Sequence, residues 1–143
     1  MIFLVDTNVL VYRFDPRDPR KQRIAREVLR RGIADRTARI PHQVLVEFFA
    51  VATRPLRPDR RVLLTAAEAT RECEDLLGTF DVLWPSAPLF RLALRGRAAY
   101  ELSWFDAHLW AYAEFHGIPR LLSEDLAHGA RYGTVEVVDP FRT

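Results

Sequence analysis

Short apolar runs alternate with longer stretches of helical periodicity along most of this chain of 143 residues. The short runs predict strands at 2–5, 38–40, 80–84, 119–122 and 134–138. The longer stretches predict helices at 8–13, 20–33, 42–53, 66–78, 87–100 and 104–116, with a further short one at 126–130. Strands separated by helices favour a mainly parallel sheet that is covered on both faces. We therefore predict a three-layer α/β fold, with about five central strands flanked by helices, in a single domain over 1–143.

Polar residues at several expected helix starts support these boundaries. Thr65 and Glu68 have the spacing of a capping box, and Ser86 stands directly before another helix. Pro19 can occupy the first turn of the helix that follows it, because the N–H that proline lacks would have no partner there. These signals predict where helices begin.

The composition is that of an ordinary globular protein. Hydrophobic residues make up 49% of the chain, yet no apolar stretch approaches the ~20 residues that a membrane span needs. The amino-terminal residues show no basic region followed by a long apolar segment, so we expect no secretory signal. Cys73 is the only cysteine, which forbids an internal disulfide and suits a reducing compartment. The predicted location is therefore the cytoplasm.

The basic residues are unusual in kind and in position. Lys21 is the only lysine among 21 basic residues, and residues 13–39 hold ten basic and four acidic side chains although the net charge is only +2. Arginine binds phosphate through two parallel bonds and stacks on bases, so this segment favours a nucleic-acid partner. A GC-rich coding sequence would also raise arginine over lysine, and it explains the composition better than the clustering. The candidate RNA-binding residues are Arg20, Arg23, Arg26, Arg30 and Arg31.

The first predicted strand ends in three polar residues before the apolar sequence resumes. Asp6, Thr7 and Asn8 follow the strand at 2–5 and precede Val9. A simple turn would more often use Gly or Pro. Ligands bind at the carboxyl ends of the strands in a parallel α/β sheet, so this strand is suited to hold Asp6 at such an edge. Asp6 is therefore the first candidate site residue.

A second acid lies inside an almost wholly apolar helix. Apolar side chains surround Glu47 in "VLVEFFAV", so this helix is expected to be largely buried. A buried carboxylate is costly unless it is paired or binds a metal. Arg54 is two turns away, too far for a direct ion pair within the helix. A functional acid is favoured over a glutamate that reaches solvent at the helix edge.

Two further acids stand where a capping role competes with a functional one. Ser103 and Asp106 have the spacing of a capping box, although the start of a helix also keeps a carboxylate ionised, as a metal ligand must be. Asp125 comes just after a predicted strand, but it could instead cap the short helix expected at 126–130. Glu124 competes with Asp125 for the role of fourth acid.

Together these acids would lie at or near one edge of the sheet. Several carboxylates close together repel one another at neutral pH unless protons or cations offset their charge. A site made of oxygen ligands, with few histidines, suits Mg²⁺ or Mn²⁺. Such a cation commonly serves phosphoryl chemistry, where it activates water and stabilises the leaving oxygen.

Four motifs in this order resemble those of PIN-domain proteins. They are "LVDTNVLV", "VLVEFFAV", "SWFDAHLWAYAE" and "LLSEDL", and the resemblance covers essentially the whole chain. The short single-domain form looks like the VapC toxin ribonucleases of type II toxin–antitoxin pairs. The resemblance implies a parallel sheet flanked by helices, in agreement with the fold predicted above. It also implies a metal site formed by Asp6, Glu47, Asp106 and Asp125, with Thr7, Asn8 and Ser123 beside it.

The resemblance implies an activity and partners as well. Members of the family act as divalent-metal-dependent endoribonucleases on structured RNA such as tRNA or ribosomal RNA. They are typically homodimers, and a small antitoxin inhibits them with a tail that reaches the active site. Apolar residues on the stretches 8–13, 20–33 and 42–64 predict an exposed groove for such an antitoxin; they include Leu10, Val28, Phe49 and Leu63.

Other classes of protein require residues that this chain lacks. A haloacid-dehalogenase-like phosphatase needs a second aspartate two residues after the first, where this chain has Asn8. A response-regulator receiver domain needs paired amino-terminal acids and a late lysine, and the only lysine is Lys21. An RNA-binding or scaffold module of the same fold, without catalytic activity, stays open. Trp104 and Phe105, beside Asp106, could stack on a base, although we expect them in the core.

Overall fold

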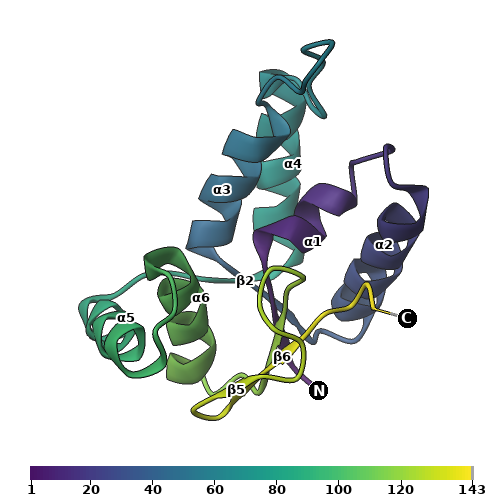
Figure 1. Cartoon of the computed structure of the whole chain (residues 1–143). Coiled ribbons are helices and arrows are strands. Elements are labelled where there is room, and N and C mark those ends of the chain that lie inside the picture. The colour runs from purple at the N-terminus through teal and green to yellow at the C-terminus, as the bar shows by residue number, and fades with distance from the viewer. Residues whose placement is uncertain (143) are drawn as a thin grey trace.

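The computed structural model describes residues 1–142, and a six-stranded sheet lies at its centre (Figure 1). The strands are β1 Phe3–Val5, β2 Ala38–Pro41, β3 Asp81–Leu83, β4 Arg120–Leu122, β5 Arg131–Tyr132 and β6 Val135–Val138. Their order across the sheet is β3-β2-β1-β4-β6-β5. Neighbouring strands are parallel except β5 and β6, which are antiparallel.

Helices connect the strands and flank the sheet, so the predicted α/β fold with a mainly parallel sheet is confirmed. The helices are α1 Thr7–Tyr12, α2 Pro19–Ala34, α3 His42–Ala52, α4 Ala66–Thr79, α5 Ala87–Tyr100 and α6 Trp104–Phe115. Helix α6 packs on β1, β4 and β6 and is itself covered by α5, whereas α2 packs on β2. Figure 1 shows α2 on the opposite side of the sheet from α5 and α6. No helix within residues 1–142 combines the length and the apolar character that a membrane crossing needs.

The predicted helix starts are confirmed. Thr65 and Glu68 form a complete capping box, in which each side chain accepts a hydrogen bond from the backbone N–H of the other residue. The Ser86 hydroxyl accepts from the Leu89 N–H at 3.3 Å, and Pro19 occupies the first turn of α2.

The segment after β4 differs from the prediction. The short helix expected at 126–130 is wrong, because these residues form bends and turns. Their backbone groups bond to β6 instead of closing a helical turn: the Gly129 N–H donates to the Val137 carbonyl, and the Val137 N–H donates to the Ala130 carbonyl, both at 2.9 Å. The strand Arg131–Tyr132 follows, and the predicted set of about five strands did not contain it.

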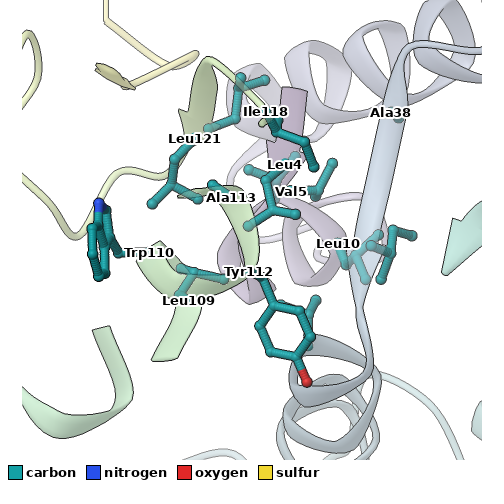
Figure 2. Packing of buried hydrophobic residues seen from close by; sticks show 14 of the residues in the cluster. Leu4, Val5, Leu10, Ala38, Leu109, Trp110, Tyr112, Ala113, Ile118 and Leu121 are labelled. Atoms are coloured by element: carbon teal, nitrogen blue, oxygen red, sulfur yellow. The ribbon is translucent and has the colours of Figure 1, made fainter. Parts of the chain in front are cut away.

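The core between the sheet and α6 anchors the central strand. Leu4 and Val5 of β1 are fully buried, and Figure 2 shows them in one cluster with Leu109 and Ala113 of α6. Burial of one such leucine or valine stabilises the fold by roughly 1.5–3 kcal/mol. Strand β1 is therefore held firmly, and so is the residue that follows it, Asp6.

Helix α3 is less buried than its sequence predicts. Val44 and Phe48 are fully buried, whereas Val46 is 57% and Phe49 36% exposed. One face of α3 packs on α1, α4 and β2, and the other face is exposed within the described part of the chain. The expectation of a largely buried helix is therefore wrong for that second face. Glu47 is half-buried.

The strand register brings distant polar residues together at the carboxyl edge of the sheet. Strand β1 lies between β2 and β4, and Val5 pairs with Leu122. Asp6 and Ser123 therefore leave neighbouring strands side by side, and the Asp6 N–H donates to the Leu122 carbonyl at 3.0 Å. The predicted position of Asp6, at the carboxyl end of a central strand, is confirmed.

Candidate active site

Asp6 ends β1 and caps the helix that follows. Its Oδ1 atom accepts the Thr7 backbone N–H at 2.6 Å, and Asp6 occupies the cap position directly before α1. Its Oδ2 atom accepts the Ser123 hydroxyl at 2.6 Å, and the residue is only 7% exposed. The carboxylate is therefore held in one orientation by its own helix and by β4.

Glu47 is held by residues from two helices. The Thr7 hydroxyl donates to Glu47 Oε2 at 2.6 Å, and Gln43 Nε2, one turn earlier in α3, donates to Oε1 at 3.0 Å. Gln43 Nε2 also donates to the Phe105 carbonyl at 3.2 Å, which ties α3 to the start of α6. Thr7 thus links the two acids, because its backbone bonds to Asp6 and its side chain to Glu47.

Asn8 connects the acids on the other side of the site. Its Nδ2 group lies 3.2 Å from Asp6 Oδ2 and 3.2 Å from Asp125 Oδ2. The Asp125 N–H donates to the Ser123 hydroxyl at 3.1 Å, so the loop after β4 is fixed by the same serine that bonds to Asp6. Asp125 does not cap a helix, because the short helix expected after it is absent from the described residues.

The backbone N–H of Asp106 is capped by Ser103, whereas the side chain of Asp106 takes no part in capping. The Ser103 hydroxyl accepts the Asp106 backbone N–H at 3.2 Å, which is half of the predicted capping box. The reciprocal bond is missing: within residues 1–142 the Asp106 carboxylate accepts no hydrogen bond and forms no ion pair. This carboxylate is free to bind something else.

One pocket brings all four predicted acids together. Its volume is about 380 Å³, and Asp6, Glu47, Asp106 and Asp125 all line it. The predicted neighbours Thr7 and Asn8 line it as well, whereas Ser123 is fully buried behind Asp6. The other residues of the lining are Val11, Tyr12, Asp15, Arg17, Gln43, Val51, Phe105, Leu109 and Glu124.

The acids of this pocket fall into two groups. Asp15 forms a two-bond ion pair with Arg17, and Glu124 forms an ion pair with Lys21 at 2.7 Å and accepts the Tyr12 hydroxyl at 2.6 Å. The second group has no Lys, Arg or His partner within residues 1–142; it consists of Asp6, Glu47, Asp106 and Asp125. Glu124 is thus neutralised inside the protein, and its neighbour Asp125 is not.

The unpaired acids affect the proton affinity of Asp6. Its pKa is raised from 3.8 to about 6, mainly by burial and to a smaller extent by the charges of Asp125 and Glu47. The hydrogen bonds from Ser123 and Thr7 act in the opposite direction and favour the ionised form. In contrast, the hydrogen bonds from Arg17 hold the pKa of Asp15 below its usual value.

Among the described residues the pocket does not hold a preformed metal site, but its donors have the chemistry that a divalent cation needs. Within residues 1–142 no three Asp, Glu, His or Cys side chains are already gathered closely enough to hold one. Most of the carboxylate oxygens are instead bonded to Thr7, Asn8, Ser123 and Gln43. The chemistry of the donors nevertheless fits a hard cation, because the pocket offers several carboxylates without basic partners in the described residues and no thiolate.

The five arginines predicted to bind RNA lie on α2, and none of them lines this pocket. Four of them are bonded within the chain: Arg20 to the Phe141 carbonyl, Arg26 to the Arg13 carbonyl, and Arg30 and Arg31 to Glu27 of the same helix. Arg23 is exposed and has no such partner within residues 1–142.

Sequence reasoning missed or misplaced several residues near the site. Phe105 is 67% exposed and lines the pocket, so the expectation of a core position is wrong. Gln43 was not predicted, although its position one turn before Glu47 is a usable signal. Leu10, assigned to an exposed antitoxin groove, is fully buried, so that groove cannot include it.

The fold and the site together define a class of α/β domain in which parallel strands end at a pocket lined by acids, and four of these acids have no basic partner within residues 1–142. The family model of the PIN domain matches residues 3–131, and the chain belongs to this family. A comparison with curated proteins finds no match.

Solved structures share the fold over nearly the whole chain. VapBC2 from Rickettsia felis, bound to a DNA fragment from its promoter, has a TM-score of 0.68 and 15% identity, covering 96% of this chain and 97% of that one. DNA-bound VapBC from Salmonella typhimurium has a TM-score of 0.70 and 15% identity, covering 98% of each. VapC20 from Mycobacterium tuberculosis, a toxin that cleaves the sarcin-ricin loop, has a TM-score of 0.62 and 19% identity, covering 86% and 91%.

Proposed function

We propose that this protein is a divalent-metal-dependent endoribonuclease that hydrolyses phosphodiester bonds in RNA, and that it is the toxin of a type II toxin–antitoxin pair. One observation carries the proposal. Asp6, Glu47, Asp106 and Asp125 line a single pocket, and none of them has a basic partner within residues 1–142. Membership of the PIN family supports a nuclease. The active unit is a single domain over 1–143, and it acts in the cytoplasm.

The four acids are the residues that would hold Mg²⁺ or Mn²⁺. Such a cation, when bound, activates a water molecule and stabilises the leaving oxygen of a phosphodiester. Other side chains of the protein hold three of these carboxylates in fixed orientations. Thr7 holds Glu47, Ser123 holds Asp6, and Asn8 spans Asp6 and Asp125. Residues that orient metal ligands in this way commonly change metal affinity by about 10–100-fold when they are mutated.

The proton affinity of Asp6 suits this role at neutral pH. With a pKa of about 6, its carboxylate is mainly ionised at pH 7 and can accept a cation. At lower pH a proton on the carboxylate competes with the cation, so cleavage should decline as the pH falls below 6. The arginines of α2, with Arg23 the most available, attract the RNA through its phosphates.

The proposed antitoxin and RNA substrate are inferred from solved structures that share this fold. VapBC structures from two organisms share this fold, and we extend to this chain a small antitoxin that places an arginine among the four acids. VapC20 cleaves the sarcin-ricin loop, which favours a structured RNA of the tRNA or ribosomal class as substrate. The exposed residues Val46 and Phe49 of α3 are available for a homodimer contact.

The test compares two neighbouring acids. Purified protein is incubated with total RNA and Mg²⁺ or Mn²⁺, and cleavage is mapped with and without EDTA. Asp125→Asn should lower cleavage by more than about 100-fold, because it removes a ligand rather than a residue that supports one. Glu124→Gln should lower it by less than about tenfold, because Lys21 already neutralises Glu124.

Absence of metal-dependent cleavage by the wild type would refute the nuclease and favour the RNA-binding or scaffold alternative. Equal loss in both variants would refute the separation of Asp125 from Glu124. The antitoxin is tested separately, by expression of the complete operon. A small partner should copurify with the chain, and two products that migrate separately at micromolar concentration would contradict the pairing.

A further inference from the structure

The loop between α3 and α4 carries a dense group of arginines that no predicted role includes. Residues 54–61 contain Arg54, Arg57, Arg60 and Arg61 with a single acid, Asp59. Arg61 pairs with Asp59 at 3.4 Å, and both side chains are exposed. The other three arginines form no ion pair or side-chain hydrogen bond within residues 1–142. The loop therefore presents uncompensated positive charge.

This loop lies next to the acidic pocket. A second hollow of about 390 Å³ is lined by Arg57 and Arg61 of the loop and by Phe14, Pro16 and Arg17 of the α1–α2 connection. Arg17 also lines the acidic pocket, so the two hollows adjoin at this residue. Figure 1 shows the loop and the α1–α2 connection at the same end of the molecule, beyond the helices that carry the site.

Backbone bonds give the loop a defined shape. The Leu56 N–H donates to the Arg61 carbonyl at 2.7 Å, and the Arg60 N–H donates to the Leu56 carbonyl at 2.6 Å. At the base of the loop, the Leu64 N–H donates to the Ala52 carbonyl at 3.0 Å. The arginine side chains therefore project from a hydrogen-bonded turn. The backbone of this turn loses little conformational entropy when the arginines bind a ligand.

The two hollows carry opposite net charge. Three arginines and one acid line the second hollow, whereas six acids and one arginine line the acidic pocket. The acidic pocket repels RNA phosphates, so a strand that reaches it needs a nearby region of opposite sign. The arginines of α2 meet this need less directly, because none of the five lines either hollow and two of them are paired with Glu27. The α3–α4 loop meets it better, because Arg57 lines the second hollow, and Arg54, Arg57 and Arg60 form no ion pair or side-chain hydrogen bond in the described residues.

We propose that the α3–α4 loop holds the phosphates of the RNA strand on one side of the cut, so that the RNA runs from the acidic pocket past Arg17 into the second hollow. Arg57 lines that hollow, and Arg54 and Arg60 are its exposed neighbours in the loop. This proposal rests on the proposed ribonuclease function and names the residues that position its substrate. The loop arginines are positioning residues: they fix where the strand lies and do not touch the reacting atoms.

The experiment compares two triple variants that each remove three positive charges. The loop variant carries Arg54→Gln, Arg57→Gln and Arg60→Gln. The α5 variant carries Arg91→Gln, Arg95→Gln and Arg97→Gln, three exposed arginines of a helix that contributes no residue to either hollow. The substrate is an oligonucleotide of about ten nucleotides around a mapped cleavage site, close to the length that a single-strand groove covers. Cleavage is measured with Mn²⁺, and binding is measured in EDTA at several salt concentrations.

The loop variant should raise KM by about tenfold or more at low salt, with a much smaller change in kcat. Its slope of log affinity against log salt should fall by about 2, since each phosphate contact on a single strand contributes about 0.7. The α5 variant should match the wild type in KM and in slope. Thermal unfolding of both variants verifies that they are folded.

Two results would overturn the proposal. If both triple variants weaken binding equally, the effect is one of net charge alone. If the loop variant binds and cleaves like the wild type, the loop does not contact RNA, and its arginines are left for a protein partner. A wild type that does not cleave RNA with any divalent metal would instead refute the proposed function, so the two failures are distinguishable.

Discussion

The stability of the metal-free protein should depend on Asp6 in a way that varies with pH. Burial raises the pKa of Asp6 from 3.8 to about 6, so the folded protein binds this proton more tightly than the unfolded chain does. A difference of this size corresponds to about 3 kcal/mol. The folded state therefore loses stability through Asp6 as the pH rises from about 4 to about 6, and the loss is complete near pH 7.

Asp6→Asn removes the charge and keeps the size of the side chain and its capping ability. In EDTA, the free energy of unfolding of the variant minus that of the wild type should rise by about 3 kcal/mol between pH 3 and pH 7. For a domain of this size, 1 kcal/mol corresponds to roughly 2–4 °C in Tm. The variant should therefore gain roughly 6–12 °C on the wild type over this pH range when both are unfolded by heat and followed by circular dichroism.

Asp15→Asn is the matched control. Asp15 is also buried and lines the same pocket, but the hydrogen bonds from Arg17 lower its pKa. Its ionised form therefore stabilises the fold above its unfolded pKa, and this stabilisation is lost as the pH falls through its lowered folded pKa. Asp15→Asn should destabilise the protein at pH 7, opposite in sign to Asp6→Asn. The reasoning is refuted if the difference between Asp6→Asn and the wild type does not change with pH, or if both variants are destabilised alike.

Three further results are expected. Mg²⁺ or Mn²⁺ at about 100 times its dissociation constant should stabilise the wild type by about 2.7 kcal/mol in a thermal-shift assay. Asp6→Asn should lose most of that gain, and RNA cleavage by this variant would contradict the assignment. Ser123→Ala removes the 2.6 Å bond to Asp6 and should weaken metal affinity by about 10–100-fold in calorimetry; unchanged affinity would leave Ser123 a structural residue. Gly96→Ala would place a Cβ atom 2.2 Å from the Trp110 ring and should cost about 1–3 kcal/mol in urea unfolding. Its control, Gly78→Ala, meets nothing within 4 Å and should be neutral or stabilising by up to about 1 kcal/mol; equal effects would refute the packing argument.

Much of the fold could be predicted because its signals are local. A capping box such as Thr65 with Glu68 needs only four consecutive residues, and an apolar run such as 2–5 shows its strand character by itself. The parallel arrangement follows from the alternation of these elements. The failures occur where backbone donors have distant partners: the segment 126–130 bonds to β6 instead of forming a helix, which its own residues do not reveal.

The candidate site, like the fold, was predictable from the sequence only in part. Asp6 and Glu47 could be named from the sequence, because an acid after a buried strand or within an apolar helix is conspicuous. Asp106 and Asp125 were preferred over capping roles, and Asp125 over Glu124, through the resemblance to PIN domains. Which acids are neutralised was decided by the tertiary structure alone. Lys21 reaches Glu124 across 103 positions of the chain, and Thr7 reaches Glu47 across 40. The physical reason is that the charge and pKa of a carboxylate depend on its burial and on the donors within a few ångströms, and only the folded chain brings those donors to it.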